Sequence, residues 1–335
     1  GDANDVDAAI VRWRKTITEQ LPDFKVAADA VARLVQQPLL DCEMPFSKLR
    51  VRGDSMCYLV PWAALPAVHH DGYWIEQVAI ELASDVGGTN IMAKAPKHTN
   101  SSLLVAGGID YGPLTSTWPL LPGSLQEAKQ VEALFHREFP KARVRRLSGS
   151  KATEAALARG MVGQDFIHLA THGFFRRENI ADAFAISGAT TLLSTGLIVA
   201  PATATPETTQ ASKTASEEDQ YMTAAEIRQL DLSRASLVML SACESGLGHA
   251  QAGQGMAGMF SSFHAAGAEH VIGTLWPVDD AATVAFVERF YDHLWQRGKT
   301  VTEAIRGAQI DMLSSADSGL RSHPYAWAAF VCSSR

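Results

Sequence analysis

A histidine and a cysteine each follow directly on an apolar run in the chain. His172 follows residues 165–171, and Cys243 follows residues 236–242. Gly173, next to the histidine, can offer an unobstructed backbone N–H, and so can Cys243 itself. A cysteine peptidase requires a thiol nucleophile, an imidazole that takes up the thiol proton, and hydrogen-bond donors aimed at the developing oxyanion. These residue types predict nucleophilic catalysis by Cys243, with His172 as general acid and base and the backbone N–H groups of Gly173 and Cys243 as the oxyanion hole.

The two apolar runs are predicted to be strands of one sheet. Residues 166–171 form one strand-like run, and residues 236–242 form another that is almost wholly apolar, as buried parallel strands are. From Ser102 onward, such runs alternate with segments whose apolar residues have helical spacing. This alternation predicts an α/β fold in which helices cover both faces of a mostly parallel sheet. Sites form at the carboxyl ends of the strands in such sheets, so we expect His172 and Cys243 at the same edge.

The N-terminal part of the chain has a different pattern. About 40 residues with helical spacing of apolar side chains come first. Two strand-like runs follow, at 56–60 and 74–82, and lead into a polar, glycine-containing stretch at 84–101. We therefore predict an N-terminal subdomain over residues 1–97 and the catalytic domain over residues 98–335.

One segment interrupts the alternation of the second domain. Residues 200–219 are rich in Thr, Ala, Ser, Pro and acidic residues and contain almost nothing that a core could bury. Such a composition predicts a disordered surface loop inserted into the domain.

Composition and charge exclude several classes of protein. The 335 residues are 47% hydrophobic and 19% charged, which is typical of a globular chain with a sizeable core. The net charge of −7 argues against direct binding of nucleic acid. No apolar run approaches the ~18 residues that span a membrane, and the acidic N-terminus is not a secretory signal. The first residue is not Met, which suggests a processed chain or a piece of a longer protein.

The four cysteines are scattered and form no C-x-x-C pair. This usage predicts reduced thiols in the cytoplasm, and neither a disulfide framework nor a zinc site. We therefore expect no metal and no cofactor. The cysteines are Cys42, Cys57, Cys243 and Cys332.

Longer blocks around the two reactive residues resemble the CHAT family of caspase-like cysteine peptidases. The resemblance extends from about Leu34 to the C-terminus and implies a caspase-like three-layer α/β sandwich with an N-terminal degenerate caspase-like subdomain. It also implies a His172–Cys243 dyad that needs no metal. The matching blocks are HLATHGFF (168–175), LSACESG (240–246), AGAEHVIGTLWPVDD (266–280), YLVPWAALP (58–66) and HPYAWAAFV (323–331).

Three acidic residues are candidate contacts for the substrate. Asp279 and Asp280 follow the predicted strand at 270–276, and in separases, which belong to the same clan, the comparable loop supplies an acid that holds a P1 arginine. Glu244, next to the predicted nucleophile, is the third. Other CHAT peptidases prefer non-basic residues at P1, so the resemblance leaves P1 open between a basic residue and Leu, Met or Asp. The alternative for Asp280 is a structural one, in which it caps a helix that begins at Ala281.

The predicted function is a cysteine endopeptidase that cleaves a specific protein partner and is held latent until it is activated. In the family, CHAT domains are often fused to repeat scaffolds or to sensors of phage attack and cleave an effector such as a pore-forming gasdermin. The resemblance therefore implies a role in bacterial defence or cell death. Because caspases are cut between the two catalytic strands on activation, residues 200–219 are either an autoprocessing site or a passive insertion. The main alternative is a non-catalytic CHAT-like scaffold or pseudoenzyme with an inert Cys243.

Overall fold

The computed structural model describes most of the chain. Cys243, Glu244 and most of the predicted loop at 200–219 lie outside the described residues. The described residues are 2–41, 46–52, 55–84, 101–175, 192, 195–202, 220–242, 252–315 and 323–335.

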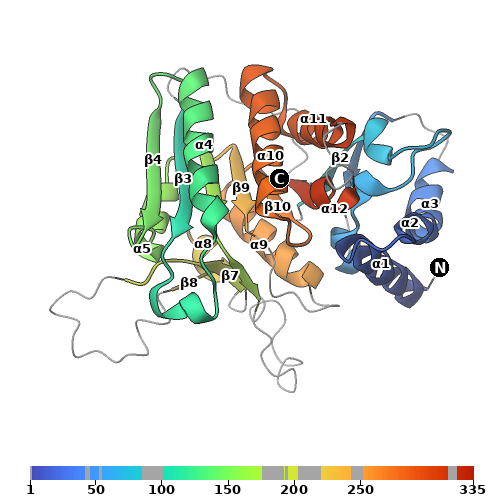
Figure 1. Ribbon diagram of the computed structural model, residues 1–335, viewed down its shortest axis with the longest axis horizontal. Coiled ribbons are helices and arrows are strands. Elements are labelled where there is room, and N and C mark those ends of the chain that lie inside the picture. The colour runs from blue at the N-terminus through green and yellow to red at the C-terminus, as the bar shows by residue number, and fades with distance from the viewer. Residues whose placement is uncertain are drawn as a thin grey trace.

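Strands and helices alternate along most of the chain (Figure 1). The strands are β1 (Lys48–Val51), β2 (Ala79–Ala83), β3 (Ser102–Ile109), β4 (Arg143–Gly149), β5 (Phe166–Ala170), β6 (Gly173–Phe175), β7 (Thr195–Ile198), β8 (Tyr221–Thr223), β9 (Leu237–Ser241), β10 (His270–Thr274) and β11 (Phe330–Ser334). The α-helices are α1 (Ala3–Thr18), α2 (Phe24–Val31), α3 (Gln37–Leu40), α4 (Pro122–Glu138), α5 (Glu154–Met161), α8 (Ala224–Ile227), α9 (Ala252–Ala266), α10 (Asp280–Tyr291), α11 (Val301–Ser314) and α12 (Pro324–Trp327).

Eight strands form the central sheet in the order β1-β2-β11-β10-β9-β5-β3-β4. Neighbouring strands are parallel except β10 and β11, which are antiparallel. The five strands from β10 to β4 therefore run in one direction, and their carboxyl ends share one edge of the sheet. A smaller antiparallel sheet has the order β6-β7-β8. The predicted α/β class with a mostly parallel central sheet is confirmed.

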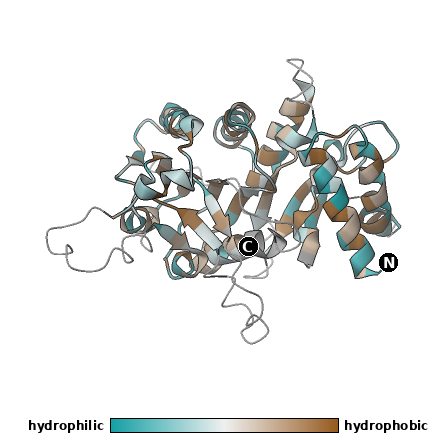
Figure 2. Cartoon of the chain, turned by 60° about the horizontal axis from the view of Figure 1, so that its bottom comes forward, coloured by the Kyte–Doolittle hydropathy of each residue, from teal (hydrophilic) through white to brown (hydrophobic). Residues whose placement is uncertain are grey.

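Helices cover both faces of the central sheet, which gives three layers. On one face, the buried His168 of β5 lies 2.9 Å from Glu127 of α4 through Nε2 and 3.0 Å from the Tyr291 hydroxyl of α10 through Nδ1. On the other face, α9 approaches so closely that a β-carbon at Gly273 of β10 would lie 3.0 Å from the Phe260 ring. Apolar strands occupy the middle of the molecule between the two helical layers (Figure 2).

One of the two predicted N-terminal strands is wrong, and the other begins five residues later than predicted. Residues 56–60 lie mostly in a 3₁₀-helix, Ser55–Leu59, because a short buried apolar run fits a helical turn as well as a strand. In the run at 74–82, a 3₁₀-turn, Trp74–Glu76, comes first, and the strand begins at Ala79. The Glu76 carboxylate accepts a hydrogen bond from the Tyr73 N–H at 2.6 Å and so favours the turn.

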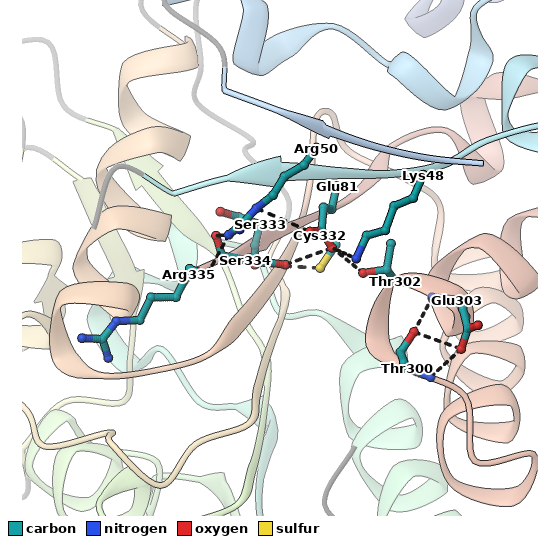
Figure 3. A network of polar contacts seen from close by, with 10 residues as sticks. All are labelled: Lys48, Arg50, Glu81, Thr300, Thr302, Glu303, Cys332, Ser333, Ser334 and Arg335. Atoms are coloured by element: carbon teal, nitrogen blue, oxygen red, sulfur yellow. Dashed lines mark hydrogen bonds and ion pairs between the residues drawn. The ribbon is translucent and has the colours of Figure 1, made fainter. Parts of the chain in front are cut away.

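A buried carboxylate ties the N-terminal strands to the C-terminal part of the chain (Figure 3). Glu81 of β2 is 5% exposed and lies 3.2 Å from Lys48 Nζ and 3.5 Å from Arg50 Nε, both on β1. The hydroxyl groups of Thr302 on α11 and Ser334 on β11 donate hydrogen bonds to the same carboxylate. Four elements thus meet at one charged group, and this arrangement compensates for its burial.

Residues on both sides of the predicted domain boundary contribute to one sheet, because β2 pairs with β11. Helix α1 is also attached across that boundary. The Arg14 guanidinium donates to the carbonyl oxygens of Leu59 at 2.9 Å and Leu275 at 2.6 Å, and it lies 5.6 Å from the ring centre of Trp276. The boundary between residues 97 and 98 lies outside the described residues, and the division into two domains stays a prediction.

Candidate active site

His172 lies at the corner between β5 and β6, at the carboxyl edge of the central sheet. Its carbonyl oxygen accepts a hydrogen bond from the N–H of Ile198 at 2.9 Å. The preceding residue, Thr171, donates its hydroxyl to the Ile198 carbonyl at 2.6 Å, and the same hydroxyl lies 3.1 Å from the Tyr111 hydroxyl. The backbone that carries the imidazole is therefore fixed from both sides.

The imidazole of His172 is held in one tautomer by a backbone carbonyl. Its Nε2 lies 2.7 Å from the carbonyl oxygen of Pro119. A carbonyl oxygen only accepts hydrogen bonds, so Nε2 carries the proton and Nδ1 of the neutral ring has a free lone pair. Nδ1 is buried, and none of the described residues forms a hydrogen bond with it. The rings of Tyr111 and Trp118 flank the imidazole, with centroids 5.2 and 5.3 Å away.

Burial disfavours the charged form of this histidine. The side chain is 6% exposed, and desolvation lowers the pKa of His172 below its usual value, although the hydrogen bond to Pro119 partly opposes that shift. A neutral imidazole with one nitrogen occupied and the other available can accept a proton from a neighbouring acid.

A close crossing of α4 over β3 holds the segment that contains Pro119. A β-carbon at Gly107 would lie 2.3 Å from the carbonyl oxygen of Ser124, and Gly108 has a φ of +64° that favours glycine. The Ser124 hydroxyl accepts from the Gly108 N–H at 2.9 Å and donates to the Leu121 carbonyl at 2.7 Å. These contacts fix the start of α4, and with it the path of the chain past His172.

Gly173, the predicted oxyanion donor, begins the outer strand of the small sheet. It is aligned with Leu197 of β7, and the N–H of Ile198 bonds to the carbonyl of His172. In this antiparallel pattern Gly173 and Leu197 are a non-hydrogen-bonded pair, so the N–H of Gly173 points away from β7. The donor lies on the outer edge of that sheet, beside the imidazole.

The parallel register brings the ends of β5 and β9 together, with Ala170 aligned with Ser241. His172 follows the first of these strand ends. Cys243 and Glu244, which follow the second, lie outside the described residues.

Asp279 and Asp280 are exposed, and they make different contacts. The Asp279 carboxylate accepts from the Ala282 N–H at 2.9 Å and is the N-cap of α10. The Asp280 carboxylate instead accepts from the Gly123 N–H at 3.1 Å. The alternative in which Asp280 caps a helix starting at Ala281 is therefore wrong, because the helix starts one residue earlier and Asp279 fills that role.

Sequence reasoning missed three residues around the imidazole. Tyr111 follows the end of β3 at the same sheet edge, and that position was a signal that could have identified it. Trp118 lies in a connecting segment. Pro119 acts through its backbone carbonyl, a group that every residue has, so its identity carried no signal.

Among the residues that the structure describes, no group of three or more His, Cys, Asp or Glu side chains could hold a metal ion. Among the same residues, no helix is long and apolar enough to cross a membrane. Cys332 is a buried free thiol.

Comparison with known proteins gives a family match and several relatives. Residues 25–335 match the CHAT domain. Tetratricopeptide repeat protein 28 of Homo sapiens is 26% identical over 297 residues, and that of Mus musculus is 28% identical over 295 residues. Each alignment covers 82% of this chain and 11% of the relative, so the chain spans about a tenth of the length of these relatives.

Two solved structures are similar in fold. The separase–securin complex of Saccharomyces cerevisiae superposes with a TM-score of 0.46 at 14% identity, covering 83% of this chain and 15% of that chain. The complex of Porphyromonas gingivalis RgpB pro- and mature domains gives a TM-score of 0.48 at 10% identity, covering 99% of this chain and 75% of that chain.

Proposed function

Because the chain belongs to the CHAT domain family, we propose that it is a cysteine endopeptidase in which Cys243 is the nucleophile and His172 the general acid and base. The observation that carries the proposal is the state of the His172 imidazole. It is buried at the carboxyl edge of a parallel sheet, and Pro119 fixes its Nε2. None of the described residues forms a hydrogen bond with its Nδ1. A structural histidine usually has partners on both nitrogens, as His168 of β5 has.

The strand register favours Cys243 as the partner of His172. Ala170 and Ser241 are aligned at the ends of the parallel strands β5 and β9. His172 comes two residues after Ala170, and Cys243 comes two residues after Ser241. Residues two apart along a strand have their side chains on the same side. This spacing supports a thiol on the side of the edge where the imidazole lies.

The reaction follows from these groups. Nδ1 of His172 takes the proton from the Cys243 thiol, and the thiolate attacks the scissile carbonyl carbon. The N–H groups of Gly173 and Cys243 stabilise the oxyanion of the tetrahedral intermediate. As the C–N bond breaks, the leaving amine takes the proton from Nδ1, and a thioester remains. Water then gives a proton to Nδ1 and attacks the thioester. The carboxylic acid leaves, and the imidazolium returns its proton to the thiolate.

Asp280 is the proposed contact for a basic side chain at P1. It is exposed, and it lies against Gly123, which follows the segment that holds His172. Asp279 is the second candidate, and one of its oxygens caps α10. Glu244 stays a prediction, because it lies outside the described residues.

We also propose that the substrate is a specific protein and that the peptidase is latent until a sensor or repeat domain activates it. The relatives support this proposal, since they are named as tetratricopeptide repeat proteins and are about nine times as long as the matching part. The family resemblance favours a cytoplasmic role in bacterial defence or cell death, with an effector such as a gasdermin as the substrate.

Thiol reactivity combined with peptide cleavage tests the proposal. The protein and its His172→Ala variant are treated with iodoacetamide, and alkylation is followed at each cysteine by mass spectrometry. We expect Cys243 to react fastest and to lose that advantage in the variant. Cys332 is the internal control, because burial raises the pKa of its thiol.

A peptide library incubated with the protein and with Cys243→Ala completes the test. Cleavage that depends on Cys243 supports the endopeptidase. An activated Cys243 without cleavage indicates a latent peptidase that lacks its activator. A Cys243 that reacts no faster than Cys57 would refute the proposal and favour a non-catalytic scaffold.

A further inference from the structure

A pocket lies beside Gly173 at the carboxyl edge of the sheet. The small β6-β7-β8 sheet, the ends of β9 and β10, and helix α9 form its walls. It holds about 410 Å³ of space, counting the part open to solvent. Its lining includes Gly173, Phe174, Leu240, Ala242, Met259 and Thr274.

The lining of this pocket is apolar, and its lining residues include no charged side chain. The two threonine hydroxyls in the walls already have acceptors. Thr195 donates to the Phe174 carbonyl at 3.1 Å, and Thr274 donates to the Ala242 carbonyl at 3.4 Å. A charged guest would therefore lose its hydration without gaining a partner, whereas an apolar guest would gain contact area.

The pocket lies on the face of the sheet opposite to Asp280. Leu240 of β9 and Ala242, which follows that strand, line the pocket, and Ser241, between them, points to the other face. That other face is covered by α4 and α10, where Asp280 contacts Gly123. Successive side chains of an extended peptide also point to opposite sides. A peptide with its P1 side chain directed toward Asp280 therefore directs the neighbouring side chain toward the pocket.

We propose that this pocket binds an apolar side chain of the substrate, on a residue adjacent to P1. The proposal rests on the proposed function, since it takes Gly173 as part of the reaction site. The substrate class is thus a peptide with a basic residue at P1 and an apolar residue next to it. Met259 is the specificity-determining residue, because its flexible side chain forms the α9 wall and is 7% exposed.

Cleavage profiles of Met259 variants test this assignment. We expect the wild type to prefer Leu, Met or Phe over Ala at one position next to P1, by about tenfold or more. Met259→Ala enlarges the pocket and should shift the preference toward larger apolar residues. Met312→Ala is the matched control, because Met312 is equally apolar and fully buried but lies on α11, away from the pocket. Unchanged profiles in Met259→Ala, or the same shift in Met312→Ala, would overturn the proposal.

A binding measurement separates this proposal from the catalytic one. Cys243→Ala protein is titrated with two peptides that differ only by Leu or Ala next to P1, and binding is read by fluorescence anisotropy. We expect tighter binding of the Leu peptide, and loss of that difference when Met259→Glu is added. If the difference is found while nothing is cleaved and Cys243 reacts with iodoacetamide no faster than Cys57, the pocket stands and the peptidase proposal fails. If cleavage is found without any difference in binding or profile, the pocket assignment fails alone.

Discussion

The Asp280 carboxylate accepts a hydrogen bond from the backbone N–H of Gly123, which lies 157 residues earlier in the chain and 3.1 Å away. This contact joins the first turn of α10 to the first turn of α4. Both helices start at the carboxyl edge of the sheet, and the chain that leads into α4 carries the Pro119 carbonyl that orients His172. The carboxylate that we propose as a substrate contact is thereby fixed relative to the proposed base.

Asp280→Asn should lower kcat/KM for peptides with Arg at P1 by about a hundredfold, because it removes a charge from the proposed contact with a guanidinium. Its stability should change little, since Asp280 is exposed. Asp279→Ala should change kcat/KM little. It should lower the free energy of unfolding by about 1 kcal/mol, because it removes the cap of α10. Peptide kinetics and urea denaturation of both variants check this. Equal kinetic losses in the two variants would contradict the assignment of Asp280.

The pH dependence of activity should reflect the lowered pKa of His172. The neutral imidazole is the active base. The midpoint of the acid limb of kcat/KM should therefore lie below pH 6.5, which is the ordinary pKa of histidine. Trp118→Ala should admit water to the ring and move the limb up toward 6.5. Titration of His172 by NMR in the Cys243→Ala background measures the same shift without turnover. Identical titration curves for the proteins with Trp118 and with Trp118→Ala would show that burial by Trp118 does not lower the pKa of His172.

Glu81→Ala should strongly destabilise the fold, because it leaves Lys48 and Arg50 without their shared carboxylate (Figure 3). We expect a loss of about 3 kcal/mol in the free energy of unfolding. Glu303→Ala is the matched control. Glu303 forms an exposed capping box with Thr300, and its loss should cost about 1 kcal/mol. Urea denaturation that gives equal losses for the two variants would contradict the role of Glu81.

Stability should fall in acid through His264, which is buried between the Ala268 carbonyl and the Ser333 hydroxyl. Burial lowers the pKa of His264 to about 4, with a smaller contribution from nearby positive charges. Its neutral form is favoured in the folded state. The contribution of His264 to stability is therefore fully present above pH 6.5 and is lost as the pH falls toward 4. The loss should be on the order of 3 kcal/mol. His264→Gln should flatten this part of the pH–stability curve, and His136→Gln, at an exposed site, should leave it unchanged.

The strands that carry the reaction site were predictable to within one or two residues. β5 and β9 are continuous apolar runs that end at small residues, and their burial on both faces produces that pattern. The N-terminal segments were not predictable in this way. Residues 56–60 form an apolar run of similar length that is buried as a 3₁₀-turn, because packing in three dimensions and not the run itself decides between the two.

The surroundings of His172 were less predictable than its position. The sequence places an imidazole at a strand end, but Pro119 lies 53 residues away and contributes a carbonyl oxygen. Only the crossing of α4 over Gly107 brings that oxygen to Nε2. The N-cap of α10 was predicted one residue late, since both Asp279 and Asp280 are residue types that can cap a helix.

The place of β11 in the sheet has a consequence for how the chain folds. β11 separates β2 from β10, so residues 79–83 cannot join the sheet until residues 330–334 are available to pair with them. This contact spans most of the sequence and closes slowly compared with the local pairing of β3, β4 and β5. During synthesis, β2 and β10 both present unpaired edges, which are prone to join other chains. Synthesis of β11 thus ends the period in which these two edges lack their partner.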